Sequence, residues 1–565
     1  MKNPLLDRLI AVLAASLALA AANGATAADT QSKKAIPIRH VIIIMQENRS
    51  FDSYFGTFPG ADGIPAEACI PGDPSNPGGN CFKPFHDPHD QNAGGPHRAA
   101  SAQSDLDDGI HKTRMDGFIY QQVKAPRNCR PDAPDCSTFE DGISRRDVIG
   151  YHTDDEIPNY WTYARKFVLQ DHMFEGVRSW SWPSHLELTS EWVAACSNSS
   201  SAASCVTDAG AKLKPEPGLQ LPWANLFQLL DAHGVSWKYY VSGGYQPDCD
   251  DDEMACPARA QNPGVPSIWN PPPFFSSVKR KGATYLAQHN PDAKVLLTDL
   301  KNGTLPQVSW VAPTDNESEH PPNSVTRGME YVTRMVNAVM ESAYWKDTAI
   351  FIAWDDWGGF YDHVPPPNVD RNPTSTPIQG YGLRVPGLMI SAYAKAGTID
   401  HAVLSFDSYA TFIEDLFMNG ARLNPTALGN PDHRPDIRDS LTEVHFPDGT
   451  TAPIGNLMDE FDFTQVPLSP VKLTTDIPPG IRVRCASTNT EHCTNPTVTV
   501  LWDGVGKRNF IYHIQRDGIE LPQCTGTATQ CTDVPPSGAH FYRAYSVSPK
   551  GVKSPLSAVA EADAP

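Results

Sequence analysis

The sequence lacks the features of a nucleic-acid-binding or disordered protein. Its 565 residues include 45 Lys and Arg against 65 Asp and Glu, a net charge of −20, and no block of like charges stands out. An acidic chain without a basic patch argues against nucleic acid as the main partner. Hydrophobic residues at 40% and aromatic residues at 9% suffice for sizeable cores, which excludes a disordered chain. The length predicts about three or four domain equivalents.

Long apolar runs are absent after the N-terminal 28 residues. Lys2 and Arg8 precede an apolar stretch over residues 9–22, which at about 14 residues is too short to span a bilayer. The Ala25-Thr26-Ala27 pattern predicts cleavage after Ala27. We therefore expect residues 1–27 to be a signal peptide, with an uncleaved membrane anchor as the alternative. After cleavage no transmembrane segment is left, which predicts a secreted or periplasmic protein.

The sequence also has no CxxC motif and no histidine at zinc-finger spacing, although it contains twelve cysteines. Such an absence disfavours structural zinc, the competing interpretation of the cysteines. After a signal peptide, an even number of closely spaced cysteines predicts disulfides that staple loops in an oxidising compartment. The six expected pairs, in chain order, are Cys69/Cys81, Cys129/Cys136, Cys196/Cys205, Cys249/Cys256, Cys485/Cys493 and Cys524/Cys531.

The chain divides into two patterns. From residue 36 to about 468, short apolar runs alternate with amphipathic stretches, which is typical of an α/β fold. A segment rich in Pro and Thr follows, and beyond it lie short alternating runs at 497–502, 509–516 and 540–547, which resemble a fibronectin type III-like sandwich. We predict an α/β domain over 28–468 and an all-β domain over 469–565. The second is expected either to stabilise the first or to bind a surface or polymer; its partner is unknown.

Polar residues follow two apolar runs of the predicted sheet. Glu47 and Asn48 come shortly after the run 41–44, and Asp355 and Asp356 come directly after the run 349–354. Because ligands bind at the carboxyl ends of parallel strands, these side chains are expected at one sheet edge. Three carboxylates and an amide oxygen form a ligand set suited to a divalent cation. The alternatives are helix capping and a structural Ca²⁺.

A helix start near residues 183–184 offers a nucleophile. Pro183 and the spacing of Ser184 and Glu187, typical of a capping box, predict a helix N-terminus there. A serine hydroxyl at this end can attack an anionic substrate, since free N–H groups and the helix dipole stabilise negative charge. Two histidines in Pro- and Gly-rich turns, His97 and His320, suit phosphate contact or proton transfer; the alternative is that they are ordinary loop residues.

Five motifs together resemble the bacterial phosphoesterase family of phospholipases C and acid phosphatases, part of the alkaline-phosphatase superfamily. They are HVIIIMQENRSFDSYFG (40–56), LPQVSWVAPT (305–314), SEHPP (318–322), DDWGGFYDHVPPP (355–367) and YGLRVPGLMIS (381–391). The resemblance covers about residues 36–468. It implies an α/β/α sandwich with a mostly parallel central sheet, metal at the sheet edge, and a Ser or Thr nucleophile that is transiently phosphorylated.

The resemblance also implies roles for particular residues. The metal ligands would be Glu47, Asn48, Asp355 and Asp356. Two histidines would contact phosphate oxygens, His97 and His320, while His363 would orient the acidic loop. Ser181 matches the nucleophile by its place two residues before Pro183. The chain has Ser184-His185 where the familiar form of the motif has Asn-Arg, which leaves Ser179 and Ser184 as weaker candidates.

The implied function is that of a metal-dependent phosphodiesterase of phospholipase C type. Its divalent ion would be Ca²⁺, Mg²⁺, Mn²⁺, Zn²⁺ or iron, and its substrate a small phosphate ester or a phospholipid headgroup. Two alternatives stay open, a phosphomonoesterase of acid-phosphatase type and a catalytically silent secreted binding protein. Other enzyme classes find no support, because the sequence has no GxSxG elbow, P-loop or HExxH motif. The leaving group and the oligomeric state are not fixed by the sequence.

Overall fold

The computed structural model describes residues 36–76, 79–106, 114–124, 144–208, 210, 212–249, 258–369, 380–434, 438–485 and 493–565. Within it, Ile38–Pro565 form one compact unit. The predicted signal peptide, residues 1–27, lies outside the described residues. In the part of the chain that the structure describes, none of the helices is long and apolar enough to cross a membrane.

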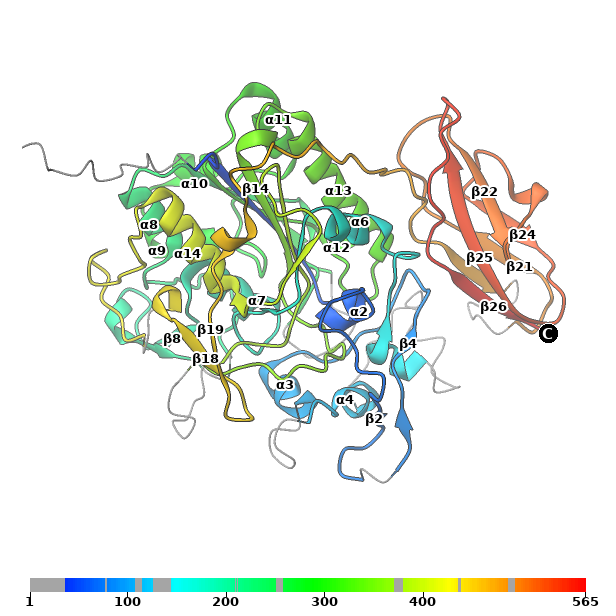
Figure 1. Ribbon diagram of the computed structural model, residues 1–565, viewed down its shortest axis with the longest axis horizontal. Coiled ribbons are helices and arrows are strands. Elements are labelled where there is room, and N and C mark those ends of the chain that lie inside the picture. The colour runs from blue at the N-terminus through cyan, green and yellow to red at the C-terminus, as the bar shows by residue number, and fades with distance from the viewer. Residues whose placement is uncertain are drawn as a thin grey trace, which may run out of the picture. The chain divides into compact units, whose positions relative to one another are not determined.

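A seven-stranded sheet forms the centre of the α/β part (Figure 1). β1 is parallel to β13 and β14, β10 is parallel to β13, and β6 is parallel to β16; β15 is antiparallel to both of its neighbours. This confirms the predicted mostly parallel sheet. Its strands, in spatial order, are β10 (Trp237–Val241), β13 (Val308–Ala312), β1 (His40–Gln46), β14 (Thr348–Trp354), β15 (Gly387–Ser391), β6 (Val168–Gln170) and β16 (Thr398–Asp400).

Helices cover both faces of this sheet. Phe351 of β14 packs on Phe412 of one helix, α14, whereas Trp354 of the same strand packs on Tyr160 of another, α6. Since residues an odd number apart point to opposite sides of a strand, these two helices lie on opposite faces. Burial on both faces explains why the central strands read as continuous apolar runs. The helices that frame the site are α2 (Phe51–Phe55), α6 (Pro158–Lys166), α7 (Ser181–Ser190), α8 (Leu226–Ala232), α13 (Val325–Glu341) and α14 (Phe406–Phe417).

The register of β1 and β14 brings two loops together at one edge of the sheet. Gln46 and Trp354 are paired as the last residues of their strands. The N–H of Asp355 then donates to the carbonyl of Gln46 at 3.0 Å. The residues that follow both strands, beginning with Glu47 and Asp355, therefore lie side by side.

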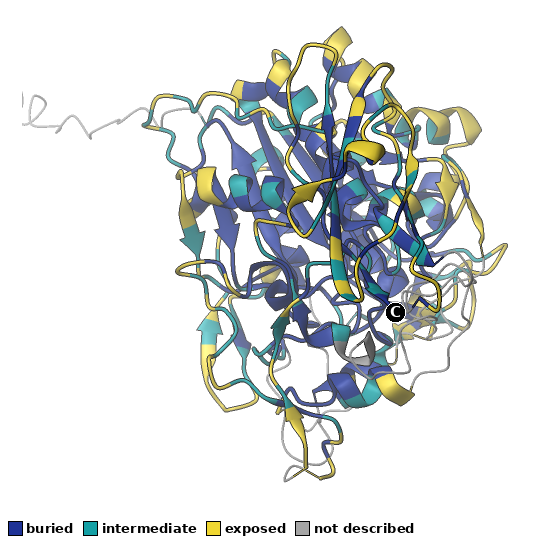
Figure 2. Ribbon diagram, turned by 90° about the vertical axis from the view of Figure 1, so that its right-hand side faces the viewer, coloured by how far each residue is buried: buried dark blue, intermediate teal, exposed yellow. Residues whose placement is uncertain are grey.

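Helix α7 lies deep in the interior, and all ten of its residues are buried; Figure 2 shows the same deep burial for the central strands. The helix begins at Ser181 after Trp180, which makes no side-chain cap. The predicted capping box of Ser184 and Glu187 is thus wrong. The Ser184 hydroxyl instead donates to the carbonyl of Asp355 at 2.6 Å, which fixes the first turn of α7 to the loop after β14.

The C-terminal part contains two antiparallel sheets. One consists of β20 (Arg482–Cys485), β21 (Val498–Leu501) and β24 (Gln530–Asp533), and the other of β23 (Ile519–Glu520), β22 (Ile511–Arg516), β25 (Gly538–Val547) and β26 (Ala560–Ala564). Side chains from both sheets share one hydrophobic core that includes Val500, Ile514 and Tyr542. The fibronectin type III assignment and the domain boundary after residue 468 stay predictions.

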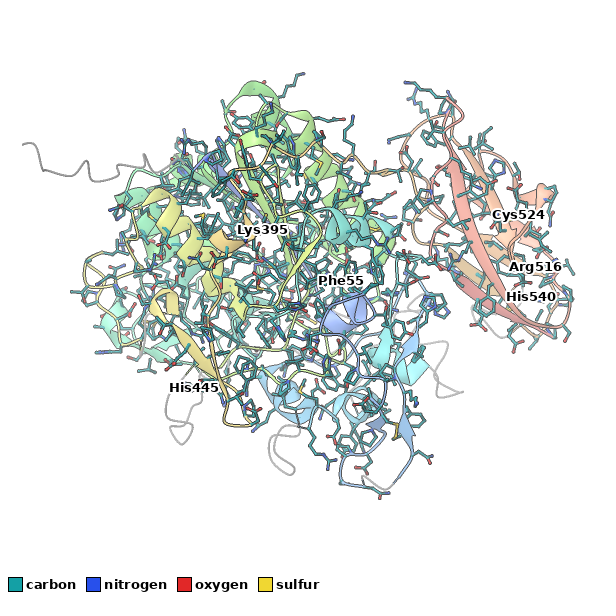
Figure 3. The ribbon with its side chains drawn as sticks, in the orientation of Figure 1. Phe55, Lys395, His445, Arg516, Cys524 and His540 are labelled. Carbon is teal, nitrogen blue, oxygen red and sulfur yellow. A yellow bond between two sulfur atoms is a disulfide. The ribbon has the colours of Figure 1, made fainter. Side chains whose placement is uncertain are left out.

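Disulfides form as the cysteine spacing predicts. Four pairs are described: Cys69–Cys81, Cys196–Cys205, Cys485–Cys493 and Cys524–Cys531, the last of which lies in the C-terminal part (Figure 3). Cys249 is also disulfide-bonded. Its expected partner Cys256 and the expected pair Cys129/Cys136 lie outside the described residues.

Candidate active site

Four buried carboxylates gather where β1 and β14 end: Glu47, Asp248, Asp355 and Asp356. Burial raises the pKa of Glu47 well above its usual range, and the charges of the other three raise it further. Burial likewise raises the pKa of Asp356. Negative groups packed this closely repel one another unless a positive charge lies among them. Such a cluster favours positively charged partners, and His97 beside Asp248 is one of them.

Ser181 lies against this cluster as the first residue of α7. Its Oγ contacts a carboxylate oxygen of Glu47, and it lies 3.0 Å from Oδ2 of Asp248 and 3.5 Å from Oδ2 of Asp356. A serine hydroxyl has one proton to donate, so three carboxylates cannot all be satisfied by it. The oxygen also sits at the positive end of the helix dipole, which favours an alkoxide or a bound anion there.

Asn48 links the carboxylates to the histidines. Its backbone adopts φ 58°, and a Cβ on Gly358, which has φ +60°, would come within 2.6 Å of the Asn48 Cβ, so the close approach requires glycine. With the amide oriented to satisfy its neighbours, its nitrogen lies 3.2 Å from both carboxylate oxygens of Asp356. Its oxygen then accepts from Nε2 of His97 and of His320, each at 3.2 Å.

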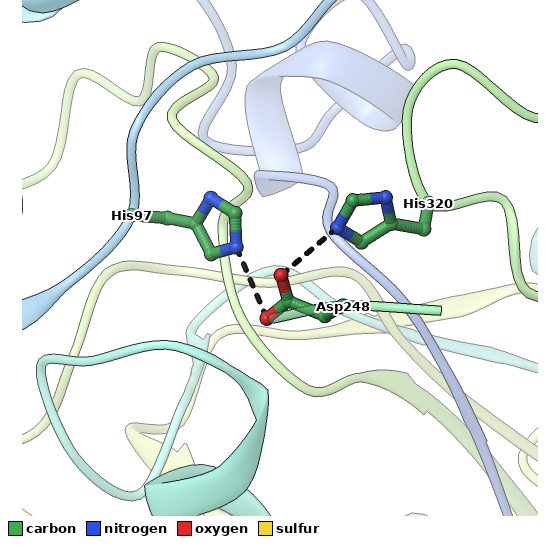
Figure 4. Close-up of side chains that lie close together, drawn as sticks. All are labelled: His97, Asp248 and His320. Carbon is green, nitrogen blue, oxygen red and sulfur yellow. Dashed lines mark hydrogen bonds and ion pairs between the residues drawn. The ribbon is translucent and has the colours of Figure 1, made fainter. Parts of the chain in front are cut away.

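His97 and His320 face a single carboxylate (Figure 4). Nε2 of His97 lies 3.3 Å from Oδ2 of Asp248, and Nε2 of His320 lies 3.2 Å from its Oδ1. Burial alone would lower the pKa of His97, but the charges of Asp248 and Asp356 raise it well above its usual value. Burial alone would raise the pKa of Asp248, yet the two histidines hold it well below its usual range. Each of these two groups therefore favours the charged form of the other.

The donor atoms at this site fit a divalent cation. Among the described residues, Oε2 of Glu47, Oδ2 of Asp355 and Nε2 of His185 are buried and make no hydrogen bond, although the last two atoms lie 3.4 Å from each other. Buried polar atoms without a hydrogen bond are rare in folded proteins, so atoms of this kind suggest a bound water or ion. The set is dominated by carboxylate oxygens, with imidazole nitrogens beside them; His97, Asp248 and His320 by themselves also form a group that could hold a metal ion.

The structure brings together seven of the residues singled out in the sequence: Glu47, Asn48, His97, Ser181, His320, Asp355 and Asp356. Of the three candidate serines, Ser181 is the one whose hydroxyl reaches the carboxylates. The hydroxyl of Ser179 is buried with no hydrogen-bond partner among the described residues, and that of Ser184 donates to a backbone carbonyl. His363 contacts Asp52 at 2.8 Å and Asp62 at 3.3 Å rather than the acidic pair.

Two residues of this site, Asp248 and His185, are not predicted from the sequence. Asp248 lies outside any predicted strand or helix, in an acidic run next to Cys249, and no local signal separates it from its neighbours. His185 was detectable, because it lies four residues after Ser181 and residues four apart share one face of a helix. Its Nδ1 lies 3.1 Å from the hydroxyl of Tyr239, which turns Nε2 toward Asp355.

Comparisons with known proteins place the chain among enzymes that cleave phosphate esters. The relatives include phospholipase C A of Mycobacterium tuberculosis (strain ATCC 25618 / H37Rv), 28% identical over 400 residues, covering 64% of this chain and 71% of the relative. Non-hemolytic phospholipase C of Burkholderia pseudomallei is 27% identical over 433 residues, covering 67% and 55%. Non-specific phospholipase C1 of Arabidopsis thaliana is 25% identical over 391 residues, covering 65% and 62%.

A solved structure of an alkaline phosphatase superfamily protein from Vibrio parahaemolyticus aligns at 14% identity over 55% of this chain and 79% of that chain. Its TM-score of 0.28 is too low to bear on the fold. The model of the Phosphoesterase family matches residues 38–418, which is more than half of the chain and includes the whole candidate site. The chain therefore belongs to the Phosphoesterase family and is a hydrolase that acts on phosphoric ester bonds.

Proposed function

We propose that the protein is a metal-dependent phosphodiesterase of phospholipase C type that works through a phosphoserine on Ser181. The observation that carries this proposal is the position of the Ser181 hydroxyl, at the start of α7 and in contact with Glu47, Asp248 and Asp356. A hydroxyl in that setting has carboxylates to take its proton and a helix end to stabilise the resulting negative charge. The phospholipase C names of the relatives support the same reaction class.

The residues proposed to hold the metal are Glu47, Asn48, Asp355 and Asp356. A divalent ion bound there would supply positive charge to the serine oxygen and to a non-bridging phosphate oxygen. The carboxylate-rich donor set is compatible with Ca²⁺, Mg²⁺, Mn²⁺, Zn²⁺ or iron.

The chain's own groups account for the bond changes. The Ser181 oxygen forms a bond to phosphorus as its proton passes to one of the carboxylates that it contacts, and the bond from phosphorus to the leaving oxygen breaks. His97, whose pKa is raised by nearby carboxylates, or His320 supplies a proton to the leaving alcohol. Water then attacks phosphorus and gives one proton to the histidine. The bond from phosphorus to the Ser181 oxygen breaks as the carboxylate returns its proton to Ser181, and the phosphate product leaves.

Asp248 favours a diester over a monoester. An incoming phosphate oxygen competes with this carboxylate for the Nε2 atoms of His97 and His320. A phosphomonoester carries up to two negative charges at neutral pH and a phosphodiester carries one, so the monoester meets more repulsion from Asp248. The proposed substrate class is therefore a small phosphodiester, such as a phospholipid headgroup ester. The N-terminal sequence supports a secreted or periplasmic location.

Hydrolysis of two chromogenic esters tests the proposal. Purified protein should cleave p-nitrophenylphosphorylcholine with a higher kcat/KM than p-nitrophenyl phosphate, and a chelator should abolish both activities until a divalent metal is restored. A preference for the monoester would support the acid-phosphatase alternative. Failure to cleave either ester with metals supplied would indicate a different phosphate ester as the substrate.

A further inference from the structure

A second cluster of metal-binding side chains lies at the edge of the central sheet. β6 and β16 are parallel, with Gln170 and Asp400 paired as their last residues. The N–H of Asp171 donates to the carbonyl of Asp400 at 3.1 Å, so the residues that follow the two strands are held side by side. These are Asp171 and His172 on one strand and His401 on the other. β15 separates β6 from β14, which ends at the candidate active site.

Asp171 is the buried centre of this cluster, with a fully buried side chain. Its Oδ2 accepts from Nδ1 of His401 at 2.7 Å and from the N–H of Asp62 at 2.8 Å. Its Oδ1 has no hydrogen-bond partner among the described residues and lies 3.4 Å from Nδ1 of His172. A buried carboxylate oxygen without a hydrogen bond is energetically unfavourable, and a bound cation would stabilise it.

His172 has oxygen atoms beside both of its ring nitrogens. Nε2 lies 3.0 Å from Oδ2 of Asp62, while Nδ1 faces the carbonyl of His401 at 3.0 Å and Oδ1 of Asp171. A neutral imidazole carries one N–H and cannot donate to both sides. Either the ring is doubly protonated or a cation lies at Nδ1. A carboxylate that holds the far nitrogen of a histidine, as Asp62 does here, is the usual support of a metal ligand.

We propose that Asp171, His172 and His401 form a binding site for a divalent cation of the Zn²⁺ type, distinct from the active site. Ligand atoms of these three residues lie within 4.8 Å of one another. A ligand set of two imidazoles and one carboxylate binds Zn²⁺ in preference to Ca²⁺ or Mg²⁺.

The surroundings of the cluster suit such an ion. The His401 side chain is 58% exposed, so the ion can enter from solvent and bind against the buried carboxylate of Asp171. Asp62 is already paired with His363 and lies near Arg384, which leaves it to orient His172 rather than to bind the metal. The ion would tie the end of the edge strand β16 to β6, and this role does not depend on the proposed phosphodiesterase activity.

Calorimetric titration of the full-length protein with Zn²⁺ tests the site. The protein should carry Glu47→Gln and Asp248→Asn. Each substitution removes one carboxylate from one of the two sets of possible metal ligands at the active site. We expect one equivalent of Zn²⁺ to bind. Adding His401→Ala should weaken this binding at least tenfold, because one of three protein ligands is lost. Adding His233→Ala, which removes an exposed histidine outside the cluster, should leave it unchanged.

Two further readouts separate binding at this site from a folding defect. Zn²⁺ should raise the melting temperature of the double variant by about 2 °C or more, and should lose this effect with His401→Ala. The circular dichroism spectrum of the double variant should be the same with and without His401→Ala. The proposal is overturned if the double variant binds no Zn²⁺, or if His401→Ala binds Zn²⁺ as tightly as the protein that keeps His401.

Discussion

Nε2 of His185 lies 3.4 Å from Oδ2 of Asp355, and both side chains are buried. His185 is one helical turn after Ser181, so α7 carries the proposed nucleophile and this imidazole toward the same carboxylate cluster. His185→Gln should raise the metal concentration needed for half-maximal activity by about 10- to 100-fold, since groups that support or bind a metal ligand have effects of this size. Metal titration of the apoprotein measures it. An unchanged metal requirement would show that His185 only packs.

Ser181→Ala should lower kcat by about 10³-fold or more, because the covalent step is lost. Ser179→Ala is a matched control, since it removes a buried hydroxyl two residues away that has no hydrogen-bond partner among the described residues. The control should stay within about threefold of the parent activity. Steady-state hydrolysis of p-nitrophenylphosphorylcholine measures both variants. A Ser181→Ala protein that keeps a tenth of the activity would rule out the phosphoserine.

Asp248→Asn should raise the kcat/KM for p-nitrophenyl phosphate relative to that for p-nitrophenylphosphorylcholine by about tenfold, because one negative charge next to the phosphate is removed. Inorganic phosphate should also inhibit the variant more strongly, since it no longer competes with a carboxylate for His97 and His320. Asp248→Glu keeps the charge and serves as the control. Equal ratios in the parent and in Asp248→Asn would exclude charge at this position as the source of diester preference.

The stability of the fold should fall as the pH rises above neutrality. Burial alone would lower the pKa of His363, but hydrogen bonds to Asp52 and Asp62 raise it to about 10. A histidine whose folded-state pKa lies above its unfolded value of about 6.5 contributes stability that is complete below pH 6.5. That contribution is lost as the pH rises toward 10. We expect a decrease of a few kcal/mol in the free energy of unfolding from this group.

His363→Gln is the variant that checks this pH dependence. Urea denaturation between pH 6 and pH 10, with a chelator present, should show a smaller decrease in stability for the variant than for the parent. His233→Gln, which changes an exposed histidine, should keep the parent slope. If the parent and His363→Gln lose stability equally over this range, the ion pairs of His363 are not its cause.

The sequence predicted the centre of the sheet but not the strands at its β16 end. Continuous apolar runs, such as 41–44 and 349–354, become part of β1 and β14, because strands buried on both faces need no polar alternation. β6 and β16 have only three residues each, too few for periodicity to be read. The antiparallel insertion of β15 depends on contacts between distant segments. Such pairings are set by tertiary structure rather than by local pattern.

The same distinction holds for the candidate site. Residues next to strand ends, such as Glu47 and Asp355, could be placed from strand direction alone, and His97 and His320 were candidates because they lie in turns rich in Pro and Gly. Asp248 could not be found, since its position depends on how a loop folds over the sheet edge. The predicted capping box does not form, because α7 begins three residues before Ser184 and the Ser184 hydroxyl donates to the carbonyl of Asp355.

The complete burial of α7 links activity to the stability of the whole core. Segments without a solvent-facing side open with free energies near that of global unfolding, and their amide protons exchange with solvent at correspondingly slow rates. A catalytic residue on a surface loop can lose its geometry well below the melting temperature. Ser181 lies on a helix that is buried along its whole length, so its position should be kept until the core unfolds. Heat inactivation of this hydrolase should therefore coincide with unfolding, and mutations that stabilise the core should prolong its working lifetime to the same degree.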